Sequence, residues 1–168
     1  HVSIGFVVGL EYRDIELSAH DLLQEFKTHP KIQRILAGGE RVAWGAKTIT
    51  EGGFLSLPSR FNAPGLALVG EGAGLVNVPR LKGVHYAVES GILAAEAILR
   101  SFQPGEAPTR VGALDSYDEG LRGSYVWKEL REVRNMRQVF DKGFFVGGAL
   151  ASAMIVSKGH LPPKDFST

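Results

Sequence analysis

The sequence contains no cysteine in its 168 residues. This chain therefore cannot form a disulfide, a thiol nucleophile, a cysteine zinc site or a cysteine-ligated iron–sulfur cluster. It also has no dominant charge, since 19 Lys and Arg residues are balanced by 18 Asp and Glu residues. Balanced charge gives no field that favours nucleic acid, so we expect no nucleic-acid partner.

Several catalytic motifs are also missing. The five histidines never show the H-x-x-x-H spacing of a metal site, and there is no G-x-S-x-G motif of a serine hydrolase. We therefore predict no metal site. The glycine motif G-x-G-x-x-G, which begins a primary dinucleotide-binding domain, is absent as well.

The composition is that of a folded globular protein, with 44% hydrophobic and 22% charged residues. Glycine is abundant, at 21 residues spread through the chain. The chain begins with His1 and passes directly into an apolar stretch, which predicts a strand entered midway. No signal-peptide pattern is present at this start.

Residues 1–58 are predicted to be part of an antiparallel sheet with helical excursions. Residues 2–12 are rich in Val, Ile and Phe, which favours a buried strand, and residues 40–50 and 54–57 are predicted as two further strands. Between them, Ser18 is a candidate N-cap of a helix that ends before Pro30. A second helix is expected over 31–36, ending at the glycine pair 38–39.

The rest of the chain is predicted to be mainly helical. A short strand at 66–69 runs into glycines, and the apolar spacing over 83–101 predicts a helix buried on most sides. The polar stretch 103–111 is expected to be a surface connection. Residues 113–134 predict one or two helices with a possible break at Gly123.

The apolar run 144–156 has two interpretations. Its thirteen residues are too few to span a bilayer, which takes about 20. Lysines near both ends and two leading phenylalanines favour a segment on the membrane surface. A buried helix with an early Gly-Gly pair explains the same sequence.

The strand, glycine loop and helix of residues 66–96 carry the chemistry. Gly72 and Gly74 lack a Cβ, so the backbone there can approach a pyrophosphate. The helix that begins near Gly83 would point its positive end toward a reduced flavin ring. This pattern indicates the second, more distal cofactor segment of a flavoprotein.

The run GLALVGEGAGLVNVPRLKGVHYAVESGILAAEAI closely resembles the flavin-contacting segment of electron transfer flavoprotein:ubiquinone oxidoreductases. It is more loosely similar to geranylgeranyl reductases and aromatic hydroxylases. GFVVGLEYRDIELSAHDLLQEFKTHPKI, GGERVAWGAKTITEGGFLSLP and SYVWKELREVRNMR resemble the same family in the same order. The resemblance covers most of residues 5–137.

This resemblance implies an FAD enzyme on an energy-conserving membrane, either the bacterial or the mitochondrial inner membrane. It would take electrons from reduced electron transfer flavoprotein and pass them to ubiquinone. Such proteins often carry a cysteine-ligated iron–sulfur cluster. Since this chain has no cysteine, the cluster would belong to a missing domain or a separate subunit.

The resemblance also implies a set of FAD-binding residues. Asn77, Pro79 and Gly83 match the family's N-V-P-x-x-K-G run, whereas Val84 replaces a hydroxyl residue often found there. An Asn amide could donate a hydrogen bond to flavin N5 or O4. The expected FAD-binding residues are Gly70, Glu71, Gly72, Ala73, Gly74, Asn77, Pro79, Lys82, Gly83 and Val84.

Some of these residues have a simpler interpretation. Glu71 either accepts a hydrogen bond from FAD or is a plain loop carboxylate, and the glycines could form an ordinary tight turn. Arg80 and Lys82 either offset flavin charge or are solvated. His85 could handle protons for quinone, although a helix-start histidine satisfied by backbone or water is the plainer interpretation.

We therefore predict an α/β (α+β) protein in three parts. Residues 1–58 belong to an antiparallel quinone-facing or substrate-facing domain, and 59–108 to the C-terminal part of a Rossmann-like FAD-binding domain. Residues 109–168 form a helical region with the membrane-surface segment. Two alternatives remain: an FAD reductase or hydroxylase of the same fold acting on a lipid or aromatic substrate, and a non-catalytic interaction module. No catalytic side chain is predicted, because the flavin carries the chemistry.

Overall fold

The computed structural model describes residues 1–101 and 114–166. The chain divides into two compact units, residues 1–47 and 48–168, and each is described by itself. The architecture is mixed helical with one small two-stranded sheet, which is consistent with an α+β class. The predicted surface connection at 103–111 lies outside the described residues.

The first unit is built around two short helices, α1 (Ala19–Thr28) and α2 (Pro30–Leu36). Ser18 caps α1 as predicted, because its Oγ accepts a hydrogen bond from the Asp21 N–H at 3.2 Å. Gly38 follows α2 with a positive φ of 73°, so the predicted glycine stop is also confirmed.

The predicted strands of the N-terminal region are wrong. The structure assigns no strand to residues 2–12 or 40–50, and Phe54–Ser56 forms a single 3₁₀ turn. A strand needs a neighbour that accepts and donates its backbone hydrogen bonds, and no such ladder is found for these segments among the described residues. The first unit also contains no fully buried residue, so its apolar side chains remain largely exposed.

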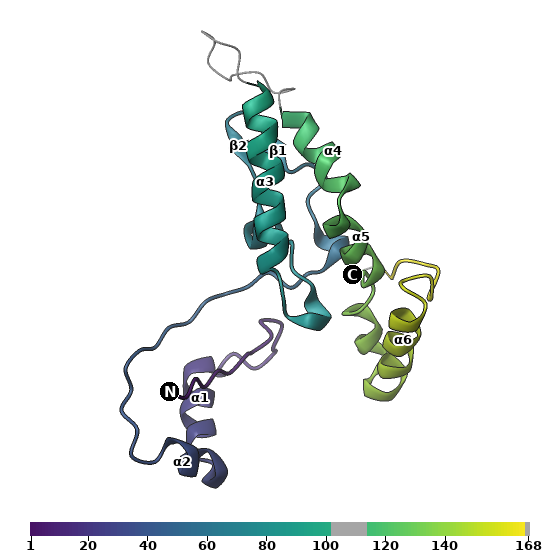
Figure 1. Ribbon diagram of the computed structural model, residues 1–168. Helices are drawn as coiled ribbons and strands as arrows, with labels where there is room; N and C mark the ends of the chain where they lie inside the picture. The colour runs from purple at the N-terminus through teal and green to yellow at the C-terminus, as the bar shows by residue number, and fades with distance from the viewer. Residues whose placement is uncertain (102–113, 167–168) are drawn as a thin grey trace. The chain divides into compact units, whose positions relative to one another are not determined.

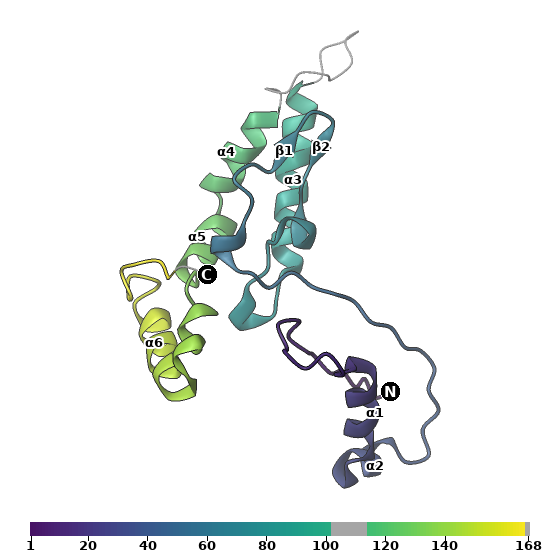
Figure 2. The ribbon, with the colours of Figure 1, turned by 180° about the vertical axis from the view of Figure 1, so that it is seen from behind.

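The second unit begins its regular structure with a hairpin. Strand β1 (Asn62–Ala63) pairs antiparallel with β2 (Leu66–Ala67), and the hairpin lies along α3 (Val84–Ser101) in both views (Figures 1 and 2). The predicted helix over 83–101 is therefore confirmed, but it is not buried on most sides. One face of α3 packs into the core and the opposite face is exposed. The buried face consists of Tyr86, Ser90, Ala94 and Ala97.

Two successive helices pack beside α3, namely α4 (Asp115–Gly123) and α5 (Tyr125–Glu132). The break at Gly123 confirms the two-helix alternative. The carboxylate of Asp118 on α4 accepts hydrogen bonds from the Phe61 N–H and the Asn62 side chain, which ties the helix to β1. The core between these elements is formed mainly by Phe61, Leu75, Tyr86, Tyr117, Leu121, Val126 and Leu130.

The last helix, α6 (Phe144–Val156), matches the predicted apolar run. It packs on the 3₁₀ turn Gln138–Lys142 through a small second cluster of Met136, Val139, Ala151 and Met154. The side chains of Arg134 and Asn135 hold the chain that follows α6 by donating to the carbonyls of Gly159, at 2.7 Å, and Lys164, at 2.8 Å. No helix in the described ranges is long and apolar enough to cross a membrane.

Candidate functional site: the glycine loop before helix α3

The loop between β2 and α3 starts at Gly70, which the fold requires to be glycine. Its φ is +58°, and a Cβ built there would lie 2.9 Å from the Cβ of Ala87 on α3. The Gly70 N–H donates to the Ser90 Oγ at 2.9 Å, in a fully buried position. Helix α3 therefore holds the beginning of the loop both by close packing and by a buried hydrogen bond.

The next residues form a 3₁₀ turn, Gly70–Ala73, which ends at Gly74 in the left-handed conformation. Ala73 is buried in the core, whereas Gly72 lies on the exposed side. A Cβ built on Gly72 would meet no atom within 4 Å. The internal structure of the loop therefore does not explain why residue 72 is glycine, and the open space leaves room for a ligand to approach the backbone.

Asn77 fixes the second half of the loop. Its backbone pairs with that of Lys82 in both directions, and its Oδ1 accepts a hydrogen bond from the Arg80 N–H at 3.3 Å. Its Nδ2 donates to the hydroxyl of Tyr86 at 3.1 Å. Only 2% of Asn77 is exposed, so its amide points into the interior of the protein.

The remaining predicted residues have different environments. Glu71 Oε1 accepts a hydrogen bond from the Thr50 N–H at 3.3 Å. Gly83 is confined, because a Cβ there would lie 3.0 Å from the carbonyl oxygen of Leu75. Pro79, Lys82 and Val84 are exposed, and Val84 starts α3 with 80% of its surface accessible. All ten predicted residues thus lie on one continuous turn-and-loop segment that leads into α3.

Sequence reasoning missed the polar side chains that stand behind this loop. The Tyr86 hydroxyl donates a hydrogen bond to Glu129 Oε2 on α5 at 2.6 Å. Burial, followed by the hydrogen bond to Glu129, raises the pKa of Tyr86 to about 12. The two residues are 43 positions apart, and no local pattern marks them as partners.

His85 lies beside the same cluster. Its ring is nearly parallel to that of Tyr125, with centroids 6.5 Å apart, and the Tyr125 hydroxyl donates to the His85 carbonyl at 3.4 Å. These contacts join the first turn of α5 to the first turn of α3. Trp127 on α5 contacts Phe54 edge-to-face, with ring centroids 4.8 Å apart, and lies under the Arg122 guanidinium.

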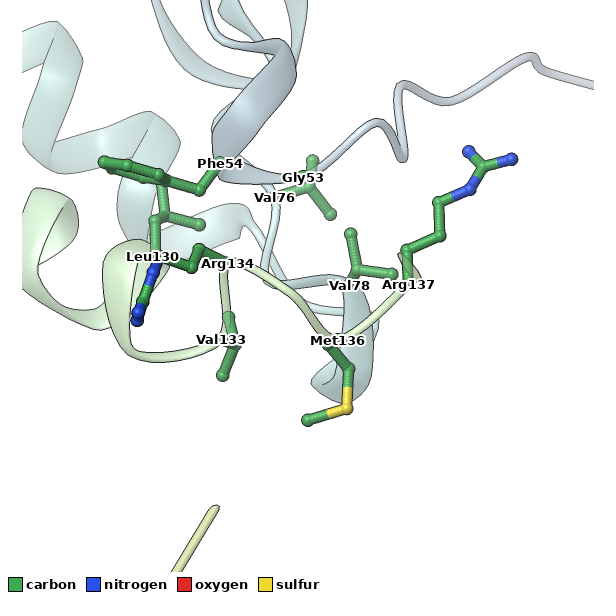
Figure 3. Close-up of a pocket in the computed structure, with 9 residues that line it drawn as sticks. All are labelled: Gly53, Phe54, Val76, Val78, Leu130, Val133, Arg134, Met136 and Arg137. Carbon is green, nitrogen blue, oxygen red and sulfur yellow. The ribbon is translucent and has the colours of Figure 1, made fainter. Parts of the chain in front are cut away.

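A small apolar recess borders the loop on the side of α5 (Figure 3). Val76 and Val78, the neighbours of Asn77, contribute to its wall together with Phe54 and Leu130. Arg134 and Arg137 also border it, and their guanidinium groups extend away from the apolar side chains. The full lining is Gly53, Phe54, Val76, Val78, Leu130, Val133, Arg134, Met136 and Arg137.

Comparison with known proteins identifies the relatives of this chain. Residues 1–49 match the family model described as "ETF-QO, ubiquinone-binding". The mitochondrial electron transfer flavoprotein-ubiquinone oxidoreductase of Oryza sativa subsp. japonica is 41% identical over 162 residues, which are 96% of this chain and 27% of that protein. The chain is similar to proteins that are named electron transfer flavoprotein-ubiquinone oxidoreductase. The resemblance predicted from the sequence is thereby confirmed.

Other relatives carry the same name. The enzyme of Caenorhabditis elegans is 41% identical over 160 residues, covering 95% of this chain and 27% of that protein. The enzyme of Homo sapiens is 44% identical over 138 residues, covering 81% of this chain and 22% of that protein. The chain thus spans about a quarter of the length of these relatives. The alignments with the Oryza and Caenorhabditis proteins cover almost the whole of this chain, so they include the glycine loop.

Proposed function

We propose that this chain is part of an FAD-dependent oxidoreductase that passes electrons from reduced electron transfer flavoprotein to ubiquinone at a membrane surface. The observation that carries the proposal is the identity of 41% over 95–96% of the chain to proteins that bear this name. The match of residues 1–49 to a ubiquinone-binding family supports the quinone as acceptor. The activity belongs to the whole protein, of which this chain corresponds to about a quarter.

FAD is proposed to lie against the glycine loop, and the loop residues fit this role in three ways. Gly72 leaves open space beside the backbone, and Gly83 has no room for a side chain where the chain turns into α3. Arg80 and Lys82 place positive charge on the exposed side of the loop, where it can offset phosphate or reduced flavin. Bound FAD would supply the redox chemistry, and the residues of this chain would bind and orient it.

The residues proposed to form the FAD site are those of the loop and of the helix start, including the buried Ala73 and Asn77, which shape the loop from within. Glu71 accepts a hydrogen bond from the Thr50 N–H, and its carboxylate is proposed to accept one from the cofactor as well. The exposed Val84 offers only an apolar contact. The full set is Gly70, Glu71, Gly72, Ala73, Gly74, Asn77, Pro79, Lys82, Gly83 and Val84.

A Rossmann-like domain is proposed as the setting of this loop. The order β2, glycine loop, α3 is the order expected of its C-terminal segment. The outer face of α3 carries Val84, Val88, Ile92 and Leu99. These side chains are 50–80% exposed and recur every one or two helical turns. An apolar stripe at this spacing is typical of a helix that packs on a sheet, and the longer relatives have the additional chain to form one.

The three domain boundaries, 1–58, 59–108 and 109–168, remain part of this proposal. The cofactor segment falls in the second and the ubiquinone-binding match in the first. Because the chain lacks cysteine, an iron–sulfur cluster would have to be ligated by another domain or by a separate subunit.

Helix α6 is proposed as a monotopic contact with the membrane. It is apolar on all sides, and Phe144 and Phe145 at its start are 79% and 88% exposed. Lys142 and Lys158 flank it and can reach lipid headgroups. On a bacterial or mitochondrial inner membrane, this surface would let ubiquinone enter without crossing water.

The test is an absorbance spectrum of the natural full-length protein that contains this chain. We expect flavin bands that are bleached by reduced electron transfer flavoprotein and recovered with a ubiquinone analogue. Bleaching by NAD(P)H but not by the flavoprotein would instead favour the reductase or hydroxylase. A folded protein that takes up no FAD would favour the remaining alternative, a non-catalytic interaction module.

A matched pair of variants tests the site itself. Gly72→Val adds a side chain toward open space, so we expect it to lower FAD content about tenfold or more while the protein stays folded. Gly148→Val makes the same change on α6, where a Cβ also meets nothing within 4 Å. Equal FAD content in both variants would contradict the proposed site.

A further inference from the structure

Three side chains from three elements form a partly buried chain of hydrogen bonds beside the glycine loop. Asn77 lies in the loop, Tyr86 in the first turn of α3, and Glu129 in α5. The Asn77 amide donates to the Tyr86 oxygen at 3.1 Å, and Tyr86 donates to Glu129 Oε2 at 2.6 Å. Tyr86 is fully buried and Asn77 almost fully so, which makes each of these bonds costly to leave unmade.

The direction of these bonds follows from the donor inventory. A tyrosine hydroxyl has a single proton to donate in a hydrogen bond. Here Tyr86 donates it to the Glu129 carboxylate, because a carboxylate can only accept hydrogen bonds. The Tyr86 oxygen is then left to accept from Asn77. Asn77 must present its NH₂ group to Tyr86 and its carbonyl oxygen to the Arg80 N–H, which is what the structure shows. Glu129 thus determines, through Tyr86, which way the Asn77 amide is turned.

The orientation of Asn77 matters for the shape of the loop. Its Oδ1 caps the 3₁₀ turn Val78–Arg80, and its backbone pairs with Lys82. A reversed amide would place NH₂ against the Arg80 N–H, so two donors would face each other. Residues 78–83, which carry the exposed Pro79, Arg80 and Lys82, therefore depend on this one amide.

We propose that Tyr86 is a positioning residue that, held by Glu129, fixes Asn77 and thereby the cofactor-facing conformation of residues 78–83. This inference rests on the proposed function of the loop. Tyr86 itself does not face the cofactor side of the loop but acts through Asn77. Glu129 is half-buried on α5, so α5 is part of the machinery that shapes the site.

The experiment compares Tyr86→Phe with Tyr117→Phe in the natural holoprotein. Both tyrosines are fully buried, and the Tyr117 hydroxyl also donates a hydrogen bond, to the Leu68 carbonyl at 2.7 Å. Each variant keeps the ring and loses one hydroxyl. We expect both to lower Tm, but only Tyr86→Phe to raise the FAD dissociation constant, about five- to tenfold, and to shift the flavin absorption bands.

Variants of Glu129 test the direction of the chain. Glu129→Gln keeps an oxygen that can accept from Tyr86, so it should bind FAD like the wild type. Glu129→Leu removes the acceptor and should match Tyr86→Phe, and the double variant Tyr86→Phe/Glu129→Leu should be no worse than either single change. If Tyr86→Phe and Tyr117→Phe have the same flavin affinity and spectrum, the inference is overturned.

A second readout separates this inference from the proposed function. Amide hydrogen exchange over residues 78–83 should be faster in Tyr86→Phe than in Tyr117→Phe, with or without flavin. If the wild-type protein binds no FAD, the proposed function is refuted. The hydrogen-exchange comparison would still decide whether Tyr86 orders residues 78–83. Equal exchange in the two variants would contradict the role of Tyr86.

Discussion

Helices α3 and α6 are both strongly apolar, yet they are attached to the protein in different ways. On α3, one face is buried and carries two polar anchors, the Ser90 hydroxyl that receives the Gly70 N–H and the Tyr86 hydroxyl bound to Glu129. On α6, the Ser152 hydroxyl donates only to Gly148 in its own helix. The buried residues of α6 are Gly147, Ala151 and Met154, two of them small.

The difference shows that apolar content alone does not determine what a helix does. Polar anchors give α3 a defined rotation about its axis, so its first turn can support a loop. Helix α6 approaches its neighbour closely through Gly147 and leaves both of its leading phenylalanines exposed. A surface of this kind fits a nonspecific apolar environment such as a lipid leaflet.

The largest expected effect on stability lies under α3. Leu121→Ala removes a fully buried side chain from the core cluster beneath that helix, and we expect it to cost about 2–5 kcal/mol of unfolding free energy. Val156 is the last residue of α6 and is 85% exposed, so Val156→Ala should lower the unfolding free energy by less than about 0.5 kcal/mol. Denaturant unfolding measures both, and similar losses would remove the contrast between the helices.

High pH should also act on the α3 side. Burial first, then the Asp118 charge, raises the pKa of Tyr117 to about 12, and Tyr86 has a similar value. In the unfolded chain these tyrosines ionise near pH 10, so the unfolded state holds fewer protons between pH 10 and 12. The contribution of these two tyrosines to the free energy of unfolding should be fully present below pH 10. It should fall as the pH rises from 10 to 12.

The measurement is a series of unfolding curves from pH 9 to pH 12. Tyr86→Phe should be less stable than the wild type at pH 9. It should lose less stability between pH 9 and pH 12, because it has one fewer tyrosine with a raised pKa. A Tyr86→Phe curve parallel to that of the wild type would show that Tyr86 ionises as in the unfolded chain.

Neighbouring glycines on α6 should give opposite effects. A Cβ on Gly147 would lie 2.8 Å from the Val139 carbonyl oxygen and 2.9 Å from Phe140, so Gly147→Ala should cost about 1–3 kcal/mol. Gly148 faces open space, and Gly148→Ala should add about 0.5–1 kcal/mol by restricting the unfolded chain. Thermal unfolding compares the two, and equal shifts would contradict the close approach at Gly147.

Serine variants isolate the polar anchor of α3. Ser90→Ala leaves the buried Gly70 N–H without its acceptor and should cost about 1–3 kcal/mol. Ser152→Ala on α6 removes an exposed hydroxyl that bonds within the helix, so its effect should be close to zero. If both variants are neutral, Ser90 does not anchor the loop.

The smallest effect on stability should accompany a large effect on membrane binding. Phe145→Ser changes a side chain that is 88% exposed, so unfolding should shift by less than about 0.5 kcal/mol. Cosedimentation of the natural protein with phospholipid vesicles should fall severalfold, because apolar area is lost. Ser152→Ala, on the same helix, removes no apolar area and is the control, and equal losses would argue against a role for the apolar surface of α6.

Local signals predicted the helices and the short strand that became β2, but they failed for the N-terminal strands. Ser18, Pro30 and Gly38 define the first two helices through contacts within a few residues, and the Gly123 break is equally local. Residues 2–12 have the composition of a strand, but their backbone finds no partner strand in the part of the chain that the structure describes. Pairing is a nonlocal property, and composition cannot supply it.

The sequence by itself determined the helices, the glycine loop that precedes α3, and the resemblance to electron transfer flavoprotein-ubiquinone oxidoreductases. Tertiary structure decided which face of α3 is buried, that Asn77 turns inward, and that Glu129 reaches Tyr86 across 43 positions. The physical reason is range. Caps and turns depend on neighbouring residues, whereas a buried hydrogen bond depends on which elements the core brings together.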